Sequence, residues 1–126
     1  MKIFFLIFSS LLAISVFSEK SSMPNANAET MLLVHKTPTC GCCNKWIEHL
    51  KTSNFKVSTQ NHESMEDVKK SYDIKPKYRS CHTGVSEDGY IFEGHIPSQY
   101  ITKFLSEDHP SAIGLSVPGM PLGSPG

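Results

Sequence analysis

The chain has 126 residues, a hydrophobic fraction of 39% and a formal net charge of zero at pH 7. This length is sufficient for one domain, and the composition is that of an ordinary globular protein. Because opposite charges balance and no basic run stands out, we expect no nucleic-acid partner.

The first residues predict a secretory signal peptide at positions 1–28. A lysine at position 2 precedes an apolar run over 3–18, which is too short for a comfortable membrane span. Residues 26–28 form an Ala-x-Ala cleavage site, residues 16–18 form a nearer but less ideal one, and an uncleaved signal would anchor the chain in the membrane. We therefore expect a periplasmic mature domain over residues 29–126, in a compartment where disulfides persist.

The hydrophobic patterns predict alternating strands and helices before a final hairpin and helix. In chain order they are a strand at 31–35, a helix from 42 to a stop at Asn54, a strand at 55–60, a helix opened by a capping box at 64–67 and ending at 72, a hairpin of 78–85 and 90–93, and a helix capped by Ser98 with its apolar face at 100–105. The proline- and glycine-rich residues 109–126 are predicted as a loop tail.

This order of elements predicts a single α/β domain with a thioredoxin-like fold. A cysteine motif at the junction of the first strand and first helix fits that arrangement. Pro76 lies where such folds place their cis-proline loop beside the cysteines.

Three of the four cysteines lie within four positions, at Cys40, Cys42 and Cys43, and the fourth is Cys81. Cys40 and Cys43 have the C-x-x-C spacing that lets two thiols meet across the first turn of a helix. Helix N-termini favour a thiolate there, because unpaired N–H groups and the helix dipole point toward it. We therefore predict a reactive cysteine cluster, with Cys81 joining it if its strand lies beside the first strand.

The cluster has three interpretations. Adjacent thiolates are soft donors that select Cu(I), and the same sulfurs could perform redox chemistry. A purely structural disulfide is the second interpretation, and a disulfide from Cys81 to Cys42 or Cys43 would leave two thiols unpaired. Zinc is the weakest, because structural zinc sites usually present two separated cysteine pairs. The sequence does not decide the pairing, since four cysteines allow three connectivities.

Two histidines and one methionine are further candidate metal ligands. His82 follows Cys81 directly, so in a regular strand the two side chains would face opposite ways unless a bulge intervened. His95 lies at the end of the hairpin, and Met120 in the tail has a thioether that copper accepts. Trp46 is most simply a core residue.

Four motifs occur in one order along the mature chain: TPTCGCCNKW, SCHTGV, GYIFEGHIP and IGLSVPGMPLGSPG. Together they resemble the CopG-like family of periplasmic metal-binding proteins, known as the domain of unknown function DUF411. The resemblance implies a thioredoxin-like fold, copper binding at the cysteine cluster and a role in copper resistance. By motif position it places the family's residues on Cys40, Cys42, Cys43, Cys81, His82, Glu93, His95 and Met120.

The hypothesis is a periplasmic copper-binding protein that contributes to copper redox interconversion or handover. Cu(I), exchanging with Cu(II), would be held by the cysteines, with His82, His95 or Met120 completing the coordination, and the partner would be a copper efflux or chaperone protein. The rival hypothesis is a thiol-disulfide oxidoreductase acting on protein substrates, with Cys40 as nucleophile and Cys43 as resolving thiol. Family resemblance alone does not make the chain an enzyme.

Overall fold

A five-stranded sheet with helices on both faces organises residues 29–126, which are the residues that the computed structural model describes. The predicted signal peptide lies outside them. The elements are β1 (Thr30–Lys36), α1 (Gly41–Thr52), β2 (Phe55–Asn61), α2 (Glu66–Ser71), the 3₁₀ helix η1 (Pro76–Tyr78), β3 (Thr83–Ser86), β4 (Ile91–Gly94), α3 (Ser98–Leu105) and β5 (Gly114–Val117). In this part of the chain, no helix is both long enough and apolar enough to cross a membrane.

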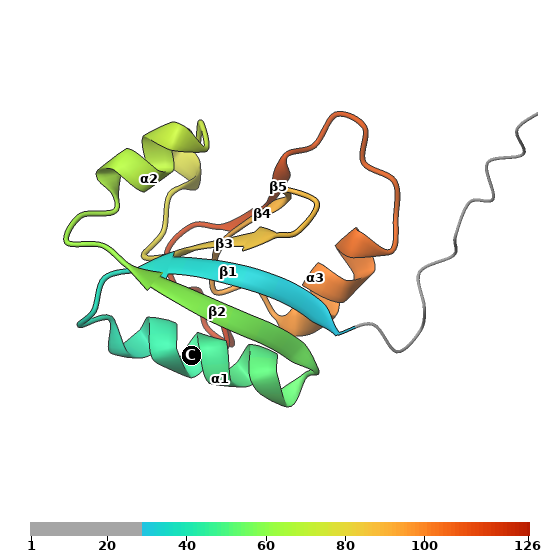
Figure 1. Cartoon of the computed structure of the whole chain (residues 1–126), viewed down its shortest axis with the longest axis horizontal. Coiled ribbons are helices and arrows are strands. Elements are labelled where there is room, and N and C mark those ends of the chain that lie inside the picture. Colours follow the sequence, from blue (N-terminus) through green and yellow to red (C-terminus); the bar gives the residue numbers. More distant parts are fainter. Residues whose placement is uncertain (1–28) are drawn as a thin grey trace, which may run out of the picture.

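The strand order is β2-β1-β3-β4-β5 (Figure 1). β1 is parallel to β2 and antiparallel to β3, and β4 is antiparallel to β3 and parallel to β5. The apolar β1 is therefore internal, as a strand that is hydrophobic at nearly every position should be. The prediction of a single α/β domain is confirmed, and His35 at the end of β1 lies opposite Thr83 at the start of β3.

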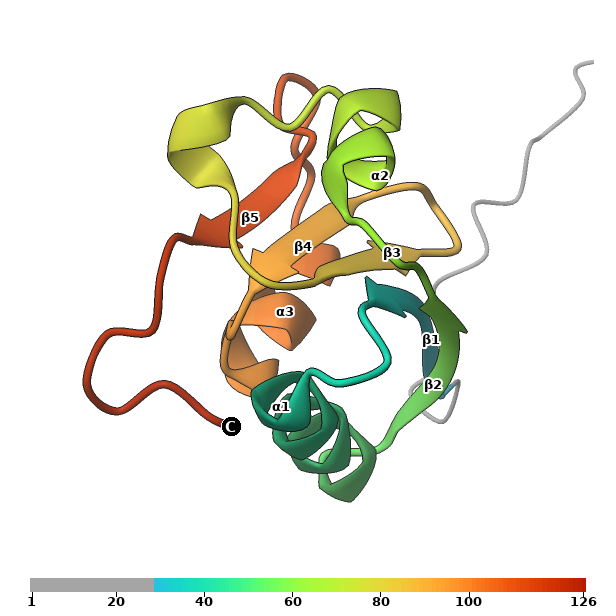
Figure 2. The same cartoon turned by 90° about the vertical axis from the view of Figure 1, so that its left-hand side faces the viewer.

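The main core lies between the sheet and the pair α1 and α3, while α2 lies on the opposite side (Figure 2). The helix α1 buries Trp46, Ile47 and Leu50, which recur at the spacing of one helix face. Its partners are apolar residues from the sheet and from α3. The fully buried members of this core are Leu32, Val34, Trp46, Leu50, Phe92, Ile96 and Ile101.

The first hairpin strand is shorter than predicted, because β3 begins only at Thr83. Pro76 opens η1 and fits its first turn, where a missing N–H does no harm. All peptide bonds in the described chain are trans, including the one before Pro76, whose isomer the sequence does not decide. Residues 79–82 then lead to β3 without belonging to the sheet.

The tail prediction is also wrong in part, because residues 114–117 form β5 beside β4. Gly114 has φ of 154° and its Cα lies close against the Ile91 backbone, so a side chain there would collide with β4. A glycine at the start of a short half-buried run is typical of a loop, but Gly114 permits the parallel pairing of β4 and β5.

Two predicted helix caps differ from those observed. The Ser64 hydroxyl accepts from the Glu66 N–H at 3.2 Å, but α2 has Met65 at its N-cap and no capping box. Ser98 is the first residue of α3 and not its cap; its hydroxyl donates to the Ser53 hydroxyl at 2.9 Å. That hydrogen bond ties α3 to the end of α1.

Candidate metal centre

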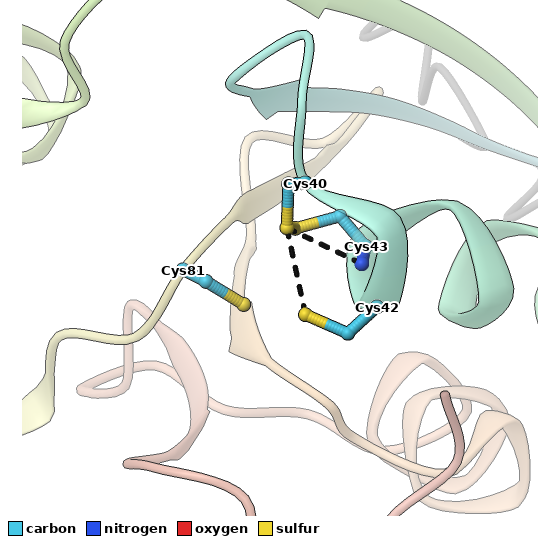
Figure 3. A group of neighbouring side chains, drawn as sticks. All are labelled: Cys40, Cys42, Cys43 and Cys81. Carbon is cyan, nitrogen blue, oxygen red and sulfur yellow. Dashed lines mark hydrogen bonds between the residues drawn. A yellow bond between two sulfur atoms is a disulfide. The ribbon is translucent and has the colours of Figure 1, made fainter.

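All four cysteine sulfurs lie within 4.8 Å of one another. Cys40 is the N-cap residue of α1, Cys42 and Cys43 are in its first turn, and Cys81 precedes β3. The predicted condition for including Cys81 is met, because β3 pairs with β1. Figure 3 shows the Cys81 side chain extending toward Cys42 at the start of the helix.

Cys40 and Cys43 form a disulfide, with their Cα atoms 5.3 Å apart. The alternative pairings of Cys81 with Cys42 or Cys43 are therefore not the ones present, and Cys42 and Cys81 are free thiols. Helix geometry explains this choice, since residues three apart face each other across one turn. Cys43 is fully buried, whereas Cys40 is half-buried. Of the two sulfurs in the disulfide, that of Cys40 is therefore the more accessible to an incoming thiol.

The Cys40 sulfur also accepts two hydrogen bonds at the helix start. The Cys43 N–H donates to it at 3.3 Å, and the Cys42 sulfur lies 3.5 Å away (Figure 3). A sulfur atom at an N-cap thus satisfies one of the N–H groups that a helix leaves unpaired. The helix start consequently presents its sulfurs as a group, and the Cys81 sulfur lies beside that of Cys42 (Figure 3).

The Cys81 thiol is half-buried, and its pKa departs from the ordinary value. Burial raises the pKa of Cys81 above its ordinary value, and the neighbouring Cys42 raises it further, while the Ser80 hydroxyl works in the opposite direction. In the metal-free protein Cys81 therefore favours the protonated form. A bound cation would reverse this preference, because a coordinated thiol loses its proton.

Two histidine nitrogens point at the Cys81 sulfur. His82 Nε2 lies 2.9 Å from the Gly94 carbonyl oxygen, and His95 Nδ1 lies 2.7 Å from the Pro125 carbonyl oxygen. A carbonyl only accepts, so both of these ring nitrogens carry hydrogen in the neutral rings. The opposite nitrogens, Nδ1 of His82 and Nε2 of His95, therefore present lone pairs, at 3.4 Å and 3.2 Å from the Cys81 sulfur.

One thiol proton cannot satisfy two lone pairs at once. The Cys81 S–H can donate to one imidazole, which leaves the other with a lone pair aimed at a sulfur. A cation among the three atoms would satisfy all of them, and these residues form a second group, Cys81, His82 and His95, whose ligand atoms lie within 4.8 Å. The donor set therefore fits a metal that accepts sulfur and imidazole nitrogen.

His82 stays neutral because of its surroundings. Burial first, and then the nearby His95, lower its pKa to about 3. The His82 ring lies 4.2 Å from the Trp46 ring between centroids. Trp46 is a core residue as predicted, but it also supports a candidate ligand, which its type and position in the sequence do not indicate.

Cys81 and His82 face the same centre, contrary to the expected alternation of a strand. Alternation applies only to residues in a regular strand, and both residues precede β3. No bulge is needed. His95 lies beside them after β4, and its ring is 4.8 Å from that of His82.

Met120 is half exposed, at 50%, in the tail after β5. Its role as a metal ligand stays a prediction. The end of the tail does reach the cysteine centre. The Pro125 carbonyl oxygen accepts a hydrogen bond from His95 Nδ1–H. Gly126 lies close to the Cys42 carbonyl oxygen and to the His95 ring. Sequence reasoning did not anticipate these backbone contacts, because a Pro/Gly-rich segment has no periodic pattern that points to them.

Three hollows in the surface of the described chain have no cysteine in their walls. One of about 440 Å³ is mostly apolar and lies between η1 and β5, with Ile74, Tyr78 and Ile113 in its wall and no cysteine. The cysteine centre is instead a tight group of ligand atoms. Its dimensions suit an ion better than an organic molecule.

Comparison with known proteins identifies the family. The sequence pattern of the family described as "Protein of unknown function, DUF411" matches residues 78–126. A solved structure of the copper resistance protein CopG, form 2, superimposes with a TM-score of 0.72 at 39% identity, covering 78% of this chain and 77% of that one. Form 1 gives a TM-score of 0.70 at 39% identity, covering 78% and 76%. The chain belongs to the CopG-like DUF411 family. A comparison with curated proteins finds no match.

Membership of the CopG-like family confirms the resemblance drawn from the four sequence motifs. The matched segment 78–126 contains Cys81, His82 and His95, whereas the other three cysteines lie before it. The structure joins the two parts, since the four sulfurs form one group.

Proposed function

We propose that the protein binds copper as Cu(I) and contributes to copper resistance by copper redox interconversion or handover. The observation that carries the proposal is the group of four cysteine sulfurs within 4.8 Å, in a chain similar to a copper resistance protein. Cys40, Cys42, Cys43 and Cys81 are the proposed thiolate ligands. His82, His95 and Met120 are the proposed additional ligands.

Copper is favoured over zinc by the kind and arrangement of donors. Thiolate and thioether donors are soft and favour Cu(I), and imidazole is acceptable to copper in both oxidation states. Zinc usually takes a tetrahedral set from two separated cysteine pairs, whereas here three sulfurs come from one helix start. Zinc remains the second candidate metal.

The disulfide makes binding depend on redox state. A four-thiolate site requires the Cys40–Cys43 bond to be broken, which takes two electrons and two protons to give two thiols. Binding of a cation then displaces the thiol protons. Reduction should therefore create the full site, and oxidation should release or exclude the metal.

Cellular location and partner belong to the same proposal. We place residues 1–28 as a signal peptide, residues 29–126 as one thioredoxin-like domain with a tail at 109–126, and the mature protein in the periplasm. The order β2-β1-β3-β4 with α1 after β1 supports the thioredoxin-like assignment. A copper efflux or chaperone protein is the expected partner, and membrane attachment would come only from an uncleaved signal.

A second function is favoured by one observation. Cys40 is half-buried and paired with the fully buried Cys43, which is how an attacking thiol and a resolving thiol are arranged. A thiol-disulfide oxidoreductase would use Cys40 as nucleophile on protein substrates. Insulin reduction tests this function separately from copper binding.

The double variant Cys40→Ser/Cys43→Ser tests the copper proposal. Loss of two of the four sulfurs should abolish tight Cu(I) binding by the reduced protein, measured against a competing Cu(I) chelator. Thr39→Ser/Asn44→Ser is the matched control, because both residues are exposed beside the cluster and all four sulfurs remain. Tight binding in the cysteine variant would refute the proposed ligands.

A further inference from the structure

A buried ion pair lies next to the proposed ligands. Lys69 of α2 and Glu93 of β4 have side chains only 3% and 2% exposed, and Lys69 Nζ lies 2.5 Å from Glu93 Oε1. Buried pairs contribute little net stability, because the desolvation of both charges offsets their attraction. The pair is therefore better explained by the further hydrogen bonds that its two side chains make.

The Glu93 carboxylate uses both oxygens on the segment Ser80–Thr83, here called the ligand segment. Oε1 accepts from the Ser80 N–H at 2.6 Å, and Oε2 accepts from the Thr83 hydroxyl at 2.7 Å. Lys69 Nζ also donates to the Thr83 hydroxyl oxygen at 3.0 Å. One carboxylate thus forms hydrogen bonds to both ends of the ligand segment.

Cys81 and His82 lie between Ser80 and Thr83, the two residues that are hydrogen-bonded to Glu93. The ligand segment lies mostly before β3, so the regular ladder of the sheet does not fix it. The Gly94 N–H donates to the His82 carbonyl at 3.2 Å, which adds one backbone contact from the same β4 end. The Cys81 sulfur is then aimed by its neighbours' hydrogen bonds, since residues on both sides are fixed to Glu93.

We infer that Glu93, neutralised by Lys69, is a positioning residue that fixes Cys81 and His82 for metal binding. This inference rests on the proposed copper-binding function. Groups that orient metal ligands from behind typically change metal affinity by about 10- to 100-fold when they are removed. The Glu-Gly-His motif therefore contains a ligand-orienting carboxylate as well as a candidate ligand.

Two charge-neutral double variants separate positioning from stability. Lys69→Met/Glu93→Gln retains an amide oxygen that can accept from the Ser80 N–H, whereas Lys69→Met/Glu93→Met retains no acceptor. Both remove the buried charges together, so neither leaves an unpaired ion. We expect the Met/Met variant to bind Cu(I) at least about tenfold more weakly than wild type, and the Met/Gln variant to recover most of the affinity.

Controls distinguish this effect from general destabilisation. Glu66→Gln is the matched control, because Glu66 pairs with Arg79 next to the ligand segment but its side chain is 56% exposed. It should bind Cu(I) as wild type does. Thermal unfolding of each variant is measured in parallel, and a purely structural role predicts affinities that follow the melting temperature. If the Met/Met variant does not fold, Thr83→Val removes the hydroxyl at Oε2 alone and should weaken binding in the same direction.

A metal-free measurement keeps the inference independent of copper. Amide hydrogen exchange at Ser80, followed by NMR, should accelerate in the Met/Met variant and stay slow in the Met/Gln variant and in Glu66→Gln. If the wild-type protein fails to bind Cu(I), the proposed function is wrong. Accelerated exchange at Ser80 in the Met/Met variant would still show that Glu93 fixes the ligand segment. Wild-type copper affinity in a folded Met/Met variant, or unchanged exchange at Ser80, would overturn the inference.

Discussion

Trp46 shows how a single residue serves both the core and the metal centre. Its side chain is fully buried, its Nε1–H donates to the Ile96 carbonyl at 2.8 Å, and its ring lies against His82. Trp46→Phe keeps an aromatic ring but leaves the carbonyl without this donor. We expect a loss of about 1–3 kcal/mol in unfolding free energy. Urea unfolding followed by circular dichroism measures it, and an unchanged midpoint would contradict the role of the hydrogen bond.

His35 should make stability depend on pH. Its Nδ1 lies 2.9 Å from His62 Nε2, and burial first, then His62 and Lys69, lower the pKa of His35 below its ordinary value. The unfolded chain then binds more protons than the folded one at acidic pH, so stability is kept above about pH 6.5 and falls as the pH decreases from there. His82 acts in the same direction.

The His35→Gln variant tests this pH dependence. Urea midpoints at about pH 7.5 and about pH 5.5 should differ less in the variant than in wild type, because one of the two histidines with a lowered pKa no longer titrates. An equal decrease in both proteins would show that His35 does not contribute.

At the residue scale, sequence reasoning found the sulfurs and missed their support. Cysteine spacing is a local property, so Cys40, Cys42 and Cys43 could be recognised as a cluster. The orientation of His82 could not be predicted, because it depends on β3 beginning only at Thr83, directly after His82. Lys69 was missed altogether, since its contact with Glu93 joins α2 to β4 across the fold.

At the element scale, helix α1 was predictable from its apolar spacing and its stop signal. Asn54 lies just beyond the helix with φ of 64°, in the left-handed region that asparagine tolerates better than most residues. β5 was not predictable, because its four half-buried residues begin with a glycine and show no alternation. Its partner β4 lies about 20 residues earlier in the chain, and Leu115 and Val117 of β5 pack against the core, so its pairing depends on distant contacts.

The end of α1 provides a prediction at this scale. Asn54→Val places a β-branched residue at positive φ and should lower the free energy of unfolding by about 1–2 kcal/mol. Asn54→Gly, which adopts this conformation without a steric penalty, is the control and should not show that loss. Chemical denaturation of both variants decides, and equal stability of the valine variant and wild type would contradict the assigned conformation.

At the scale of the whole molecule, the sheet order brings together residues from both halves of the chain. β1 leads into the cysteine helix, and its neighbour β3 follows Cys81, so the pairing of these strands assembles the centre. The tail then returns toward α1 (Figure 2), where the Pro125 carbonyl accepts a hydrogen bond from His95. The order of elements was readable from hydrophobic periodicity, whereas the return of the tail was not.

Removal of residues 118–126 tests the contribution of the tail. His95 would lose the Pro125 carbonyl, and the Cys42 backbone carbonyl would lose its neighbour Gly126. We expect alkylation of Cys42 and Cys81 by iodoacetamide to become several-fold faster in the metal-free protein. Leu122→Ser is the control, because the Leu122 side chain is fully exposed and its replacement should leave the tail in place. Equal rates with and without the tail would mean that it does not shield the thiols.

The most direct test of the account is a Cu(I) titration of the protein against a competing chelator, performed first on reduced protein and then after oxidation. The account predicts tight binding only in the reduced state, because the Cys40–Cys43 disulfide removes two of the four thiolates. Equally tight binding after oxidation would contradict a site built on these sulfurs. Weak binding in both states would remove copper as the ligand and favour the oxidoreductase.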